Sequence, residues 1–256
     1  MSYKIFAAAA VAVLSLVSIP AAAQTAAKAG DVPRLPNGKP DFNGVWDHPR
    51  AANLMAKGNA CGSGTEGCKH EAPPPLSFTA KGLKEWNDKD NHYDYTARCL
   101  PWGYTRAWGT EYPVEIMQTP QRVAILFESN NVYKVIPTDG RGLPKDPEDN
   151  WWGTSVGRYE GDTLVVDTIG FNEKTYLDTA EHPHGPKLKV TERFTMIDKD
   201  HMAHETTYTD PDYYETPFTV KDVISRMKAG TELMEYVCME NNKDLLEGHL
   251  NSAGGR

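Results

Sequence analysis

The sequence predicts an all-β protein, an antiparallel meander of strands that closes into a barrel and carries one short helix. Two observations lead to this fold class. From residue 114 onward, β-rich segments in which apolar and polar side chains alternate follow one another at nearly regular spacing. Short polar turns, such as the one at 198–200, separate neighbouring segments, and no helical stretches alternate with them. About ten such strands are enough to close a barrel, and a parallel α/β sheet is disfavoured.

The clearest strand pair is the hairpin at 151–172, which reads WWGTSVGRYEGDTLVVDTIGFN. It turns at 160–162, where glycine and aspartate tolerate the positive φ of a tight turn. In its second strand, alternation puts Asp167 on the same face as Val165 and Ile169. We therefore interpret Asp167 either as the rim of a cavity or as a paired core carboxylate.

The other elements follow in chain order. Thr79 is the predicted N-cap of the short helix, which ends near Asp88. Residues 48–76 lack periodicity and contain three consecutive prolines, so we expect a long surface loop there. Besides the hairpin, strands are expected at 42–46, 114–118, 122–128, 132–136, 188–197, 202–209, 218–226 and 232–238.

The first residues have the features of a secretory signal peptide. Lys4 precedes an apolar run over 7–19 that is too short to span a bilayer, and three alanines offer a signal-peptidase site. We expect cleavage after Ala23, a flexible leader at 24–40 and a single barrel domain over 41–256. The mature protein is therefore expected to be periplasmic or secreted.

Charge and hydropathy exclude several classes of partner. The formal net charge is −8, and Lys and Arg do not cluster, so the chain lacks the basic footprint of a nucleic-acid-binding protein. After the signal peptide, no apolar run approaches the roughly 20 residues of a membrane helix. We expect a small-molecule ligand or substrate, no nucleic acid and no membrane insertion. The sequence carries no indication of oligomeric state.

Four cysteines remain after cleavage, and an even number in an oxidising compartment favours two disulfides. Cys61 and Cys68 bracket a glycine-rich loop and are expected to pair, which leaves Cys99 with Cys238. The alternative is a metal site formed by Cys61, Cys68 and His70, although this loop lacks a C-x-x-C pair.

Several runs of the chain resemble a family of exported bacterial proteins without a settled activity. The matching runs include RCLPWG at 98–103, IMQTPQRVAILFE at 116–128, the hairpin, and EYVCMENN at 235–242. The resemblance implies the fold and the compartment, and both cysteines of the second disulfide lie within matching runs. In addition, NGVW at 43–46 resembles the G-x-W start of lipocalin-type barrels, which implies a lipocalin-like barrel.

Two polar features stand out as candidate chemistry. Alternation along 188–196 points Glu192 inward among apolar neighbours, and a buried carboxylate needs a partner, a proton or a cavity. Arg106 is a candidate partner for Glu192. His184 lies in a proline-stiffened loop that leads into this strand, and a histidine beside carboxylates can act as an acid or base near neutral pH. The alternative is that His184 bonds the backbone at the strand entry. His182 is expected to be a solvated loop residue.

These features lead to two function classes. The first is a cofactor-independent enzyme, a lyase or isomerase, in which His184 transfers protons with Asp167 or Glu192 in a barrel cavity. The second is a non-catalytic, lipocalin-like binder of a small apolar or aromatic ligand. The residues expected to bind substrate are Arg106, Trp152, Asn172, Tyr176 and Asp178.

A metal centre is the competing interpretation of the same loop. His182 and His184 with Glu192 or Asp178 could bind Zn or Fe. Two further histidines, His201 and His204, stand on opposite faces of one predicted strand. The sequence contains no P-loop, and we predict no metal and no cofactor. We further expect that His204→Ala changes neither fold nor function much.

Overall fold

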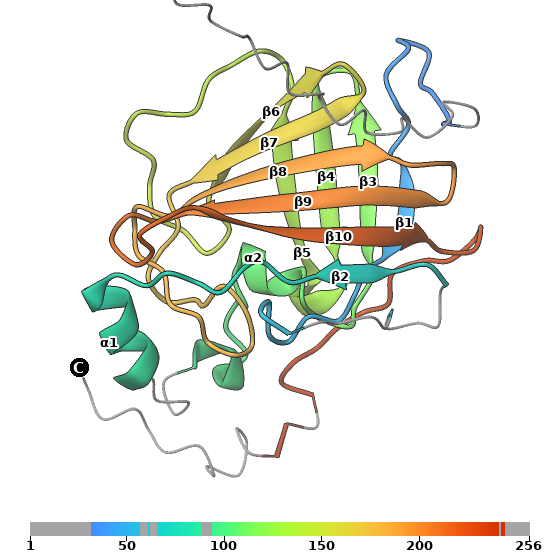
Figure 1. Cartoon of the computed structure of the whole chain (residues 1–256). Helices are drawn as coiled ribbons and strands as arrows, with labels where there is room; N and C mark the ends of the chain where they lie inside the picture. Colours follow the sequence, from blue (N-terminus) through green and yellow to red (C-terminus); the bar gives the residue numbers. More distant parts are fainter. Residues whose placement is uncertain (1–31, 57–60, 62–65, 89–93, 241, 244–256) are drawn as a thin grey trace, which may run out of the picture.

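The computed structural model describes residues 32–56, 61, 66–88, 94–240 and 242–243. The predicted signal peptide and the start of the leader lie outside the described residues. The helical elements are α1 (Ala80–Asp88), η2 (Tyr95–Arg98), α2 (Tyr104–Ala107) and η3 (Ser129–Asn131), of which α1 and α2 are labelled in Figure 1. The strands are β1 (Gly44–Asp47), β2 (Lys69–Glu71), β3 (Val114–Thr119), β4 (Arg122–Phe127), β5 (Val132–Pro137), β6 (Thr154–Glu160), β7 (Thr163–Ile169), β8 (Lys189–Met196), β9 (His201–Thr209) and β10 (Phe218–Arg226).

The strands form an antiparallel meander that curls into a nearly closed barrel, as the sequence predicts. The order is β5-β4-β3-β1-β10-β9-β8-β7-β6, with the short β2 added beside β10. The first and last strands of this order, β5 and β6, complete the barrel without a backbone ladder between them. The two strands nevertheless pack closely. A Cβ atom added to Gly157 on β6 would lie only 2.9 Å from Ile136 Cγ2 on β5, so there is no room there for a larger side chain. We call this unladdered junction the β5–β6 seam.

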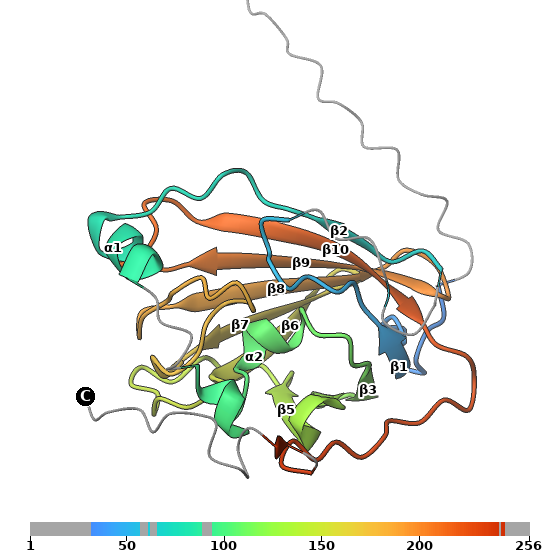
Figure 2. The same ribbon diagram turned by 90° about the horizontal axis from the view of Figure 1, so that it is seen from below.

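Alternating side chains build the interior of the barrel. Along β8, Val190, Glu192, Phe194 and Met196 are buried, whereas the residues between them are exposed or half-buried. The predicted hairpin is present as β6 and β7, and Gly161 in its turn has a φ of 62°. Figures 1 and 2 place α2 at one end of the barrel, where its buried residues close the interior.

The single predicted helix is confirmed as α1. The hydroxyl of Thr79 accepts a hydrogen bond from the Gly82 amide at 3.0 Å, which is the contact of an N-cap. The helix ends at Asp88. The remaining helical elements are single turns, too short to give a periodic signal in the sequence. Within the described ranges, no helix is long and apolar enough to cross a membrane.

Two predictions about strands are wrong. Residues 232–238 form no strand; Glu128 accepts from the Met234 amide and Asn131 pairs with the backbone of Tyr236. Residues 232–238 cannot pair with the preceding strand, β10, because β1, β2 and β9 already form ladders with it. Conversely, the expected surface loop at 48–76 contains β2, which pairs with β10 and buries His70.

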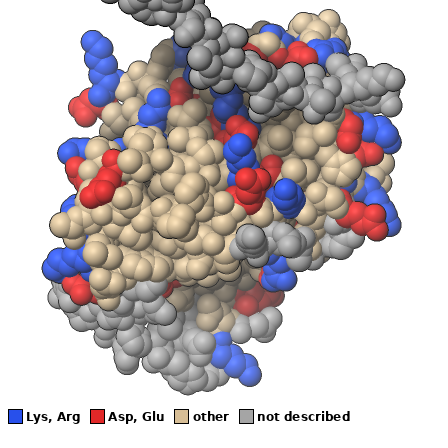
Figure 3. All heavy atoms as spheres, in the orientation of Figure 1, with Lys and Arg blue, Asp and Glu red and all other residues tan. Residues whose placement is uncertain are grey.

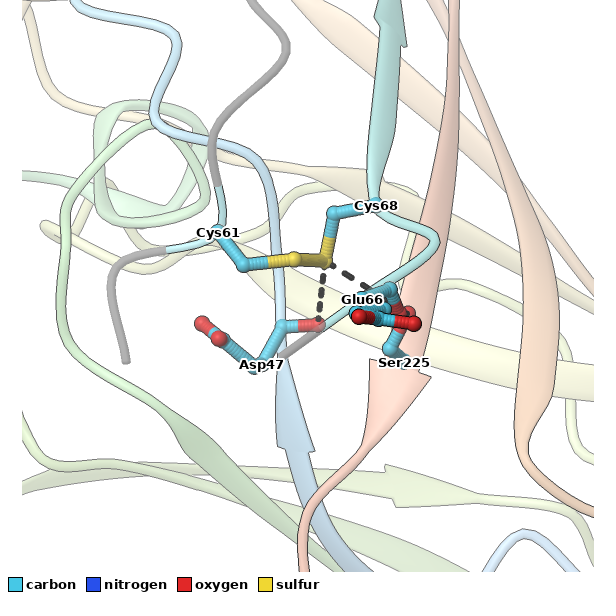
Figure 4. Close-up of a disulfide and its surroundings, with 5 residues drawn as sticks. All are labelled: Asp47, Cys61, Glu66, Cys68 and Ser225. Atoms are coloured by element: carbon cyan, nitrogen blue, oxygen red, sulfur yellow. Dashed lines mark hydrogen bonds between the residues drawn. A yellow bond between two sulfur atoms is a disulfide. The ribbon is translucent and has the colours of Figure 1, made fainter. Parts of the chain in front are cut away.

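Both predicted disulfides are confirmed. Cys61 is joined to Cys68, with their Cα atoms 5.6 Å apart, and Cys99 is joined to Cys238 at 5.4 Å. The first bridge fastens the segment that leads into β2 (Figure 4), and the second fastens the C-terminal segment next to η2.

Candidate functional site

The barrel interior contains an interior polar cluster, which we define as Tyr104, Lys134, Glu192 and His204. Glu192 is fully buried. Its Oε2 accepts a hydrogen bond from the Tyr104 hydroxyl at 2.6 Å, and its Oε1 lies 2.9 Å from His204 Nε2. Because a carboxylate only accepts hydrogen bonds, Nε2 is the ring nitrogen that carries the hydrogen. The Nδ1 of His204 is buried without a hydrogen-bond partner.

Aromatic rings surround this cluster. The His204 ring stacks on Phe194 with centroids 4.4 Å apart and lies 4.5 Å from the ring of Trp108. The Nζ of Lys134 lies 3.9 Å from the centroid of the Tyr104 ring and donates to the carbonyl of Trp152. Such walls exclude water, so charges among them interact strongly.

The electrostatics of the cluster follow from burial. Desolvation lowers the pKa of Lys134 to about 7, although the charge of Glu192 acts in the opposite direction. Burial and the negative charge of Glu192 raise the pKa of Tyr104 well above its usual value. Tyr104 therefore stays a hydrogen-bond donor at neutral pH, while Lys134 is poised between its ammonium and amine forms.

A small cavity of about 20 Å³, the end cavity, adjoins the cluster. Its polar lining includes His70, Asp178, Thr206, Tyr208 and Asp222. Thr206 connects the two regions, since its hydroxyl lies 3.2 Å from His204 Nε2. The volume has room for about one water molecule. The interior is therefore largely filled by side chains, in contrast to the open cup that the lipocalin resemblance implies.

One wall of the end cavity is a charged pair. His70 Nδ1 lies 2.6 Å from Asp222 Oδ1, and its Nε2 lies 3.1 Å from the carbonyl oxygen of Leu54. Both oxygens are acceptors, so both ring nitrogens must carry hydrogen and His70 is an imidazolium. Burial alone would lower the pKa of His70, but the hydrogen bond and charge of Asp222 outweigh it and raise the pKa.

A third histidine–carboxylate pair anchors the loop after β7. His182 was expected in solvent, and this is wrong: it is buried, 2.7 Å from Asp178 Oδ2, and stacked on Trp86 at 4.2 Å. Asp178 also accepts from the Leu54 amide at 2.8 Å. Its acceptor sites therefore hold the loop in place, although the residue does line the end cavity.

His184 is buried, but its contacts are not with the predicted acids. Its Nδ1 lies 3.3 Å from the Gly185 carbonyl and its Nε2 lies 2.8 Å from the Thr175 hydroxyl. A ring that donates to a carbonyl and accepts from a hydroxyl is neutral. Consistently, burial lowers the pKa of His184. The backbone-bonding alternative describes this residue better than the predicted acid–base pair does.

Asp167 lies on the outer face of the barrel, contrary to the expectation of a cavity rim. Its carboxylate is 2.6 Å from Arg158 and 3.0 Å from Lys189, and it accepts from Thr191 at 2.7 Å. Burial alone would raise the pKa of Asp167, but these hydrogen bonds outweigh it and lower the pKa. Asp167 is thus a paired carboxylate, and the contacts of Asp167, His184 and Glu192 do not converge on one another.

The predicted substrate-binding residues are also dispersed. Arg106 pairs with Asp94 at 2.8 Å, so the proposed Arg106–Glu192 pair is wrong. Trp152 contributes its carbonyl to Lys134 and packs against Phe127 with ring centroids 5.1 Å apart.

The last two expected substrate-binding residues contribute to loop structure. Asn172 accepts from the Lys174 amide at 3.1 Å, and the carbonyl of Tyr176 accepts from the Thr105 hydroxyl. Among the five expected residues, Asp178 alone lines the end cavity.

Sequence reasoning missed several residues of the site. His204 and Asp222 each occupy an inward position of an alternating strand, so the signal that identified Glu192 was also present for them. Lys134 is different, because a lysine ordinarily marks the wet face of a strand. Tyr104 lies on a helix too short to show a face.

A potential metal-binding group differs from those expected. Within the described residues, atoms of Asp47, Cys61 and Cys68 lie within 4.8 Å of one another. Figure 4 shows both sulfurs joined in the disulfide, and the Cys68 sulfur lies 3.6 Å from the Ser225 hydroxyl. A disulfide has no thiolate to offer a cation. The alternative metal site of Cys61, Cys68 and His70 is not formed either, because the two cysteines are joined and the His70 imidazole pairs with Asp222.

The face shown in Figure 3 carries interspersed basic and acidic side chains, and no basic patch gathers on its described residues. No protein-family model matches the chain, and no curated protein matches it significantly. The fold and the site therefore define the class as an antiparallel β-barrel with a buried polar interior.

Proposed function

We propose that this protein is an exported enzyme that acts on a small molecule as a cofactor-independent lyase or isomerase. The observation that carries the proposal is the fully buried Glu192, held at 2.6 Å by Tyr104 and at 2.9 Å by His204. In this proposal Glu192 and His204 transfer protons, replacing the pair with His184 that the sequence suggested. The expected signal peptide and the two disulfides support export.

The energetic cost of the cluster favours catalysis. Taking a carboxylate, an imidazole and an amine out of water is unfavourable, and apolar residues of similar size would stabilise a barrel at least as well. A binder of apolar ligands needs only an apolar cup. Active sites, in contrast, are where burial and neighbouring charges shift pKa values towards neutrality, as burial does for Lys134.

The roles follow from the hydrogen bonds. Glu192 is the proton acceptor, and the Nε2–H of His204 donates a hydrogen bond that holds its carboxylate in place. When Glu192 takes up the proton, the Tyr104 hydroxyl is released from the carboxylate and donates to negative charge that develops on a substrate oxygen. Since the end cavity has a volume of about 20 Å³, substrate binding requires the interior to open. The β5–β6 seam is the point of entry, because no backbone ladder has to break there.

Proton abstraction can be tested without knowing the natural substrate. Small ketones, keto acids and aromatic ketones would be incubated with the protein in D₂O, and deuterium incorporation would be followed by NMR. Glu192→Gln should lower enzyme-dependent exchange by at least about 100-fold, the usual contribution of a general base. Glu205→Gln is the matched control, because Glu205 lies on β9 facing Lys221 at the surface. Equal exchange in both variants would contradict the proposal.

The alternative function is a non-catalytic binder, and one observation favours it. A groove of about 410 Å³ lies between the β4–β5 hairpin and the C-terminal segment. Its apolar lining consists of Leu126, Phe127, Val132, Tyr133, Leu233 and Met234. Titration with the fluorescent probe 1-anilinonaphthalene-8-sulfonate would test it. Binding that is lost in Met234→Glu, with no deuterium exchange in any substrate, would favour the binder.

A further inference from the structure

We propose that Lys134 is the covalent nucleophile of the site and forms an imine with small aldehyde or ketone substrates. This inference rests on the proposed function and deepens it, because it names the substrate class and a second catalytic residue. It stands on the position of an amine inside the barrel beside a carboxylate and a phenol, enclosed by aromatic rings.

The contacts of the Lys134 amine differ from those of a simple counterion of Glu192. Lys134 is 4% exposed, although the other strand lysines are exposed at the surface. A counterion would bond the carboxylate directly. Lys134 instead donates to the carbonyl of Trp152 and rests on the face of the Tyr104 ring, whose hydroxyl holds Glu192. The amine thus lies over the face of the Tyr104 ring, and the proton acceptor lies at the hydroxyl of the same ring.

The location of Lys134 at the β5–β6 seam also makes its amine accessible to a ligand that enters there. Lys134 stands on β5, and its acceptor Trp152 precedes β6, so this hydrogen bond crosses the β5–β6 seam. A ligand that separates the two strands breaks this bond and meets the amine first. The adjoining walls, formed by Tyr104, Phe127 and Trp152, suit a flat or aromatic carbonyl compound.

The protonation state permits the reaction. The titratable groups around Lys134 are Tyr104 from α2 and Glu192 from β8, with His204 behind Glu192. With a pKa of about 7, roughly half of Lys134 is free amine at neutral pH. An ordinary lysine has a free fraction smaller by a factor on the order of 1,000.

The chemistry balances without any further reagent. The amine lone pair attacks the carbonyl carbon, the C=O π bond breaks, and one proton moves from the attacking nitrogen to the oxygen. A second proton, taken from solvent, lets this hydroxyl leave as water and gives the protonated imine, which withdraws electrons from the neighbouring carbon. Glu192 then accepts a proton from that carbon, which gives an enamine. Return of the proton at another position gives an isomerase. In a lyase, the enamine instead expels a group from the next carbon, which leaves with its bonding electrons as a C=C bond forms. Hydrolysis restores the Lys134 amine and releases a carbonyl product.

Reductive trapping tests this step directly. The full-length protein would be treated at pH 7 with benzaldehyde or acetaldehyde and sodium cyanoborohydride, and the alkylated lysine would be mapped by peptide mass spectrometry. We expect Lys134 to be labelled at least about 10-fold faster than the surface residue Lys189, as its larger free-amine fraction requires. Lys134→Met should remove the main adduct and Lys189→Met should leave it, with circular dichroism confirming that both variants fold.

The outcomes separate this inference from the proposed function. Labelling confined to surface lysines of the folded protein would overturn it, as would labelling of Lys134 only after denaturation. Deuterium exchange that depends on Glu192 but persists in Lys134→Met would leave the proposed enzyme standing without an imine. If exchange is absent while Lys134 is trapped selectively, the nucleophile is supported and the role of Glu192 as base is wrong.

Discussion

Glu192 and His204 meet diagonally across two neighbouring strands of the barrel. The register partner of Glu192 on β9 is Thr206, and that of His204 on β8 is Phe194. The diagonal places His204 Nε2 at 2.9 Å from the carboxylate while its ring stacks on Phe194, its direct neighbour. One side chain therefore serves both the polar cluster and the aromatic wall.

His204→Ala is expected to lower the free energy of unfolding by about 2 to 4 kcal/mol, because it removes a partner of a buried carboxylate and leaves a cavity beside Phe194. Urea denaturation would measure this loss. His201→Ala is the matched control, since His201 lies on the outward face of the same strand. The structure thus reverses the expectation that His204 is dispensable, and similar stability of the two variants would contradict it.

The His70–Asp222 pair should make stability fall with rising pH. The pKa of His70 is raised in the folded protein, so its stabilising contribution is complete below the unfolded value of about 6.5 and is lost as the pH rises through the folded value. Asp222→Asn should destabilise the protein by about 1 to 3 kcal/mol at pH 6 and flatten this alkaline loss. Urea denaturation between pH 6 and pH 9 would measure both, and parallel pH profiles for wild type and variant would contradict the assignment.

His184 should affect the pH dependence of stability in the opposite direction, so that stability falls as the pH decreases. Burial lowers the pKa of His184, so the neutral ring is compatible with the fold above about pH 6.5, and stability is lost as the pH falls through the lower folded value. His184→Gln keeps a hydrogen-bonding group beside Thr175 but does not titrate, so its Tm should decline less between pH 7 and pH 5. His48 is buried with a lowered pKa as well and contributes in the same direction. An unchanged acid profile in His184→Gln would refute the contribution of His184.

The two disulfides should contribute unequally. Cys99 and Cys238 are 139 residues apart and Cys61 and Cys68 are seven apart. In the chain-entropy description this corresponds to about 5 and about 2.5 kcal/mol respectively. Replacing each pair by serine and comparing free energies of unfolding in guanidinium would test the order. An equal loss would show that the C-terminal segment is held by Glu128 and Asn131 rather than by its bridge.

The sequence by itself determined the barrel and part of its sidedness, although the same alternation did not show that Asp167 faces outward. Alternation is a local property of a strand, so it predicted the hairpin β6–β7 and the inward direction of Glu192 without knowledge of neighbours. The disulfides also followed from local spacing and an even number of cysteines. The strand expected at 232–238 could not form a hairpin with β10, because β1, β2 and β9 already pair with both edges of β10.

The tertiary structure decided which polar residues meet. Alternation states on which face of its strand a residue lies, but the partner across the barrel depends on register, curvature and closure. Those features brought Tyr104 and His204 to Glu192 and left Asp167 and His184 apart from it. Lys134 shows most clearly what alternation in the sequence cannot predict. Its charge predicts a solvent-facing side chain, yet the face that it shares with Ile136 is the one that closure of β5 against β6 buries, and only packing of the whole barrel determines that choice.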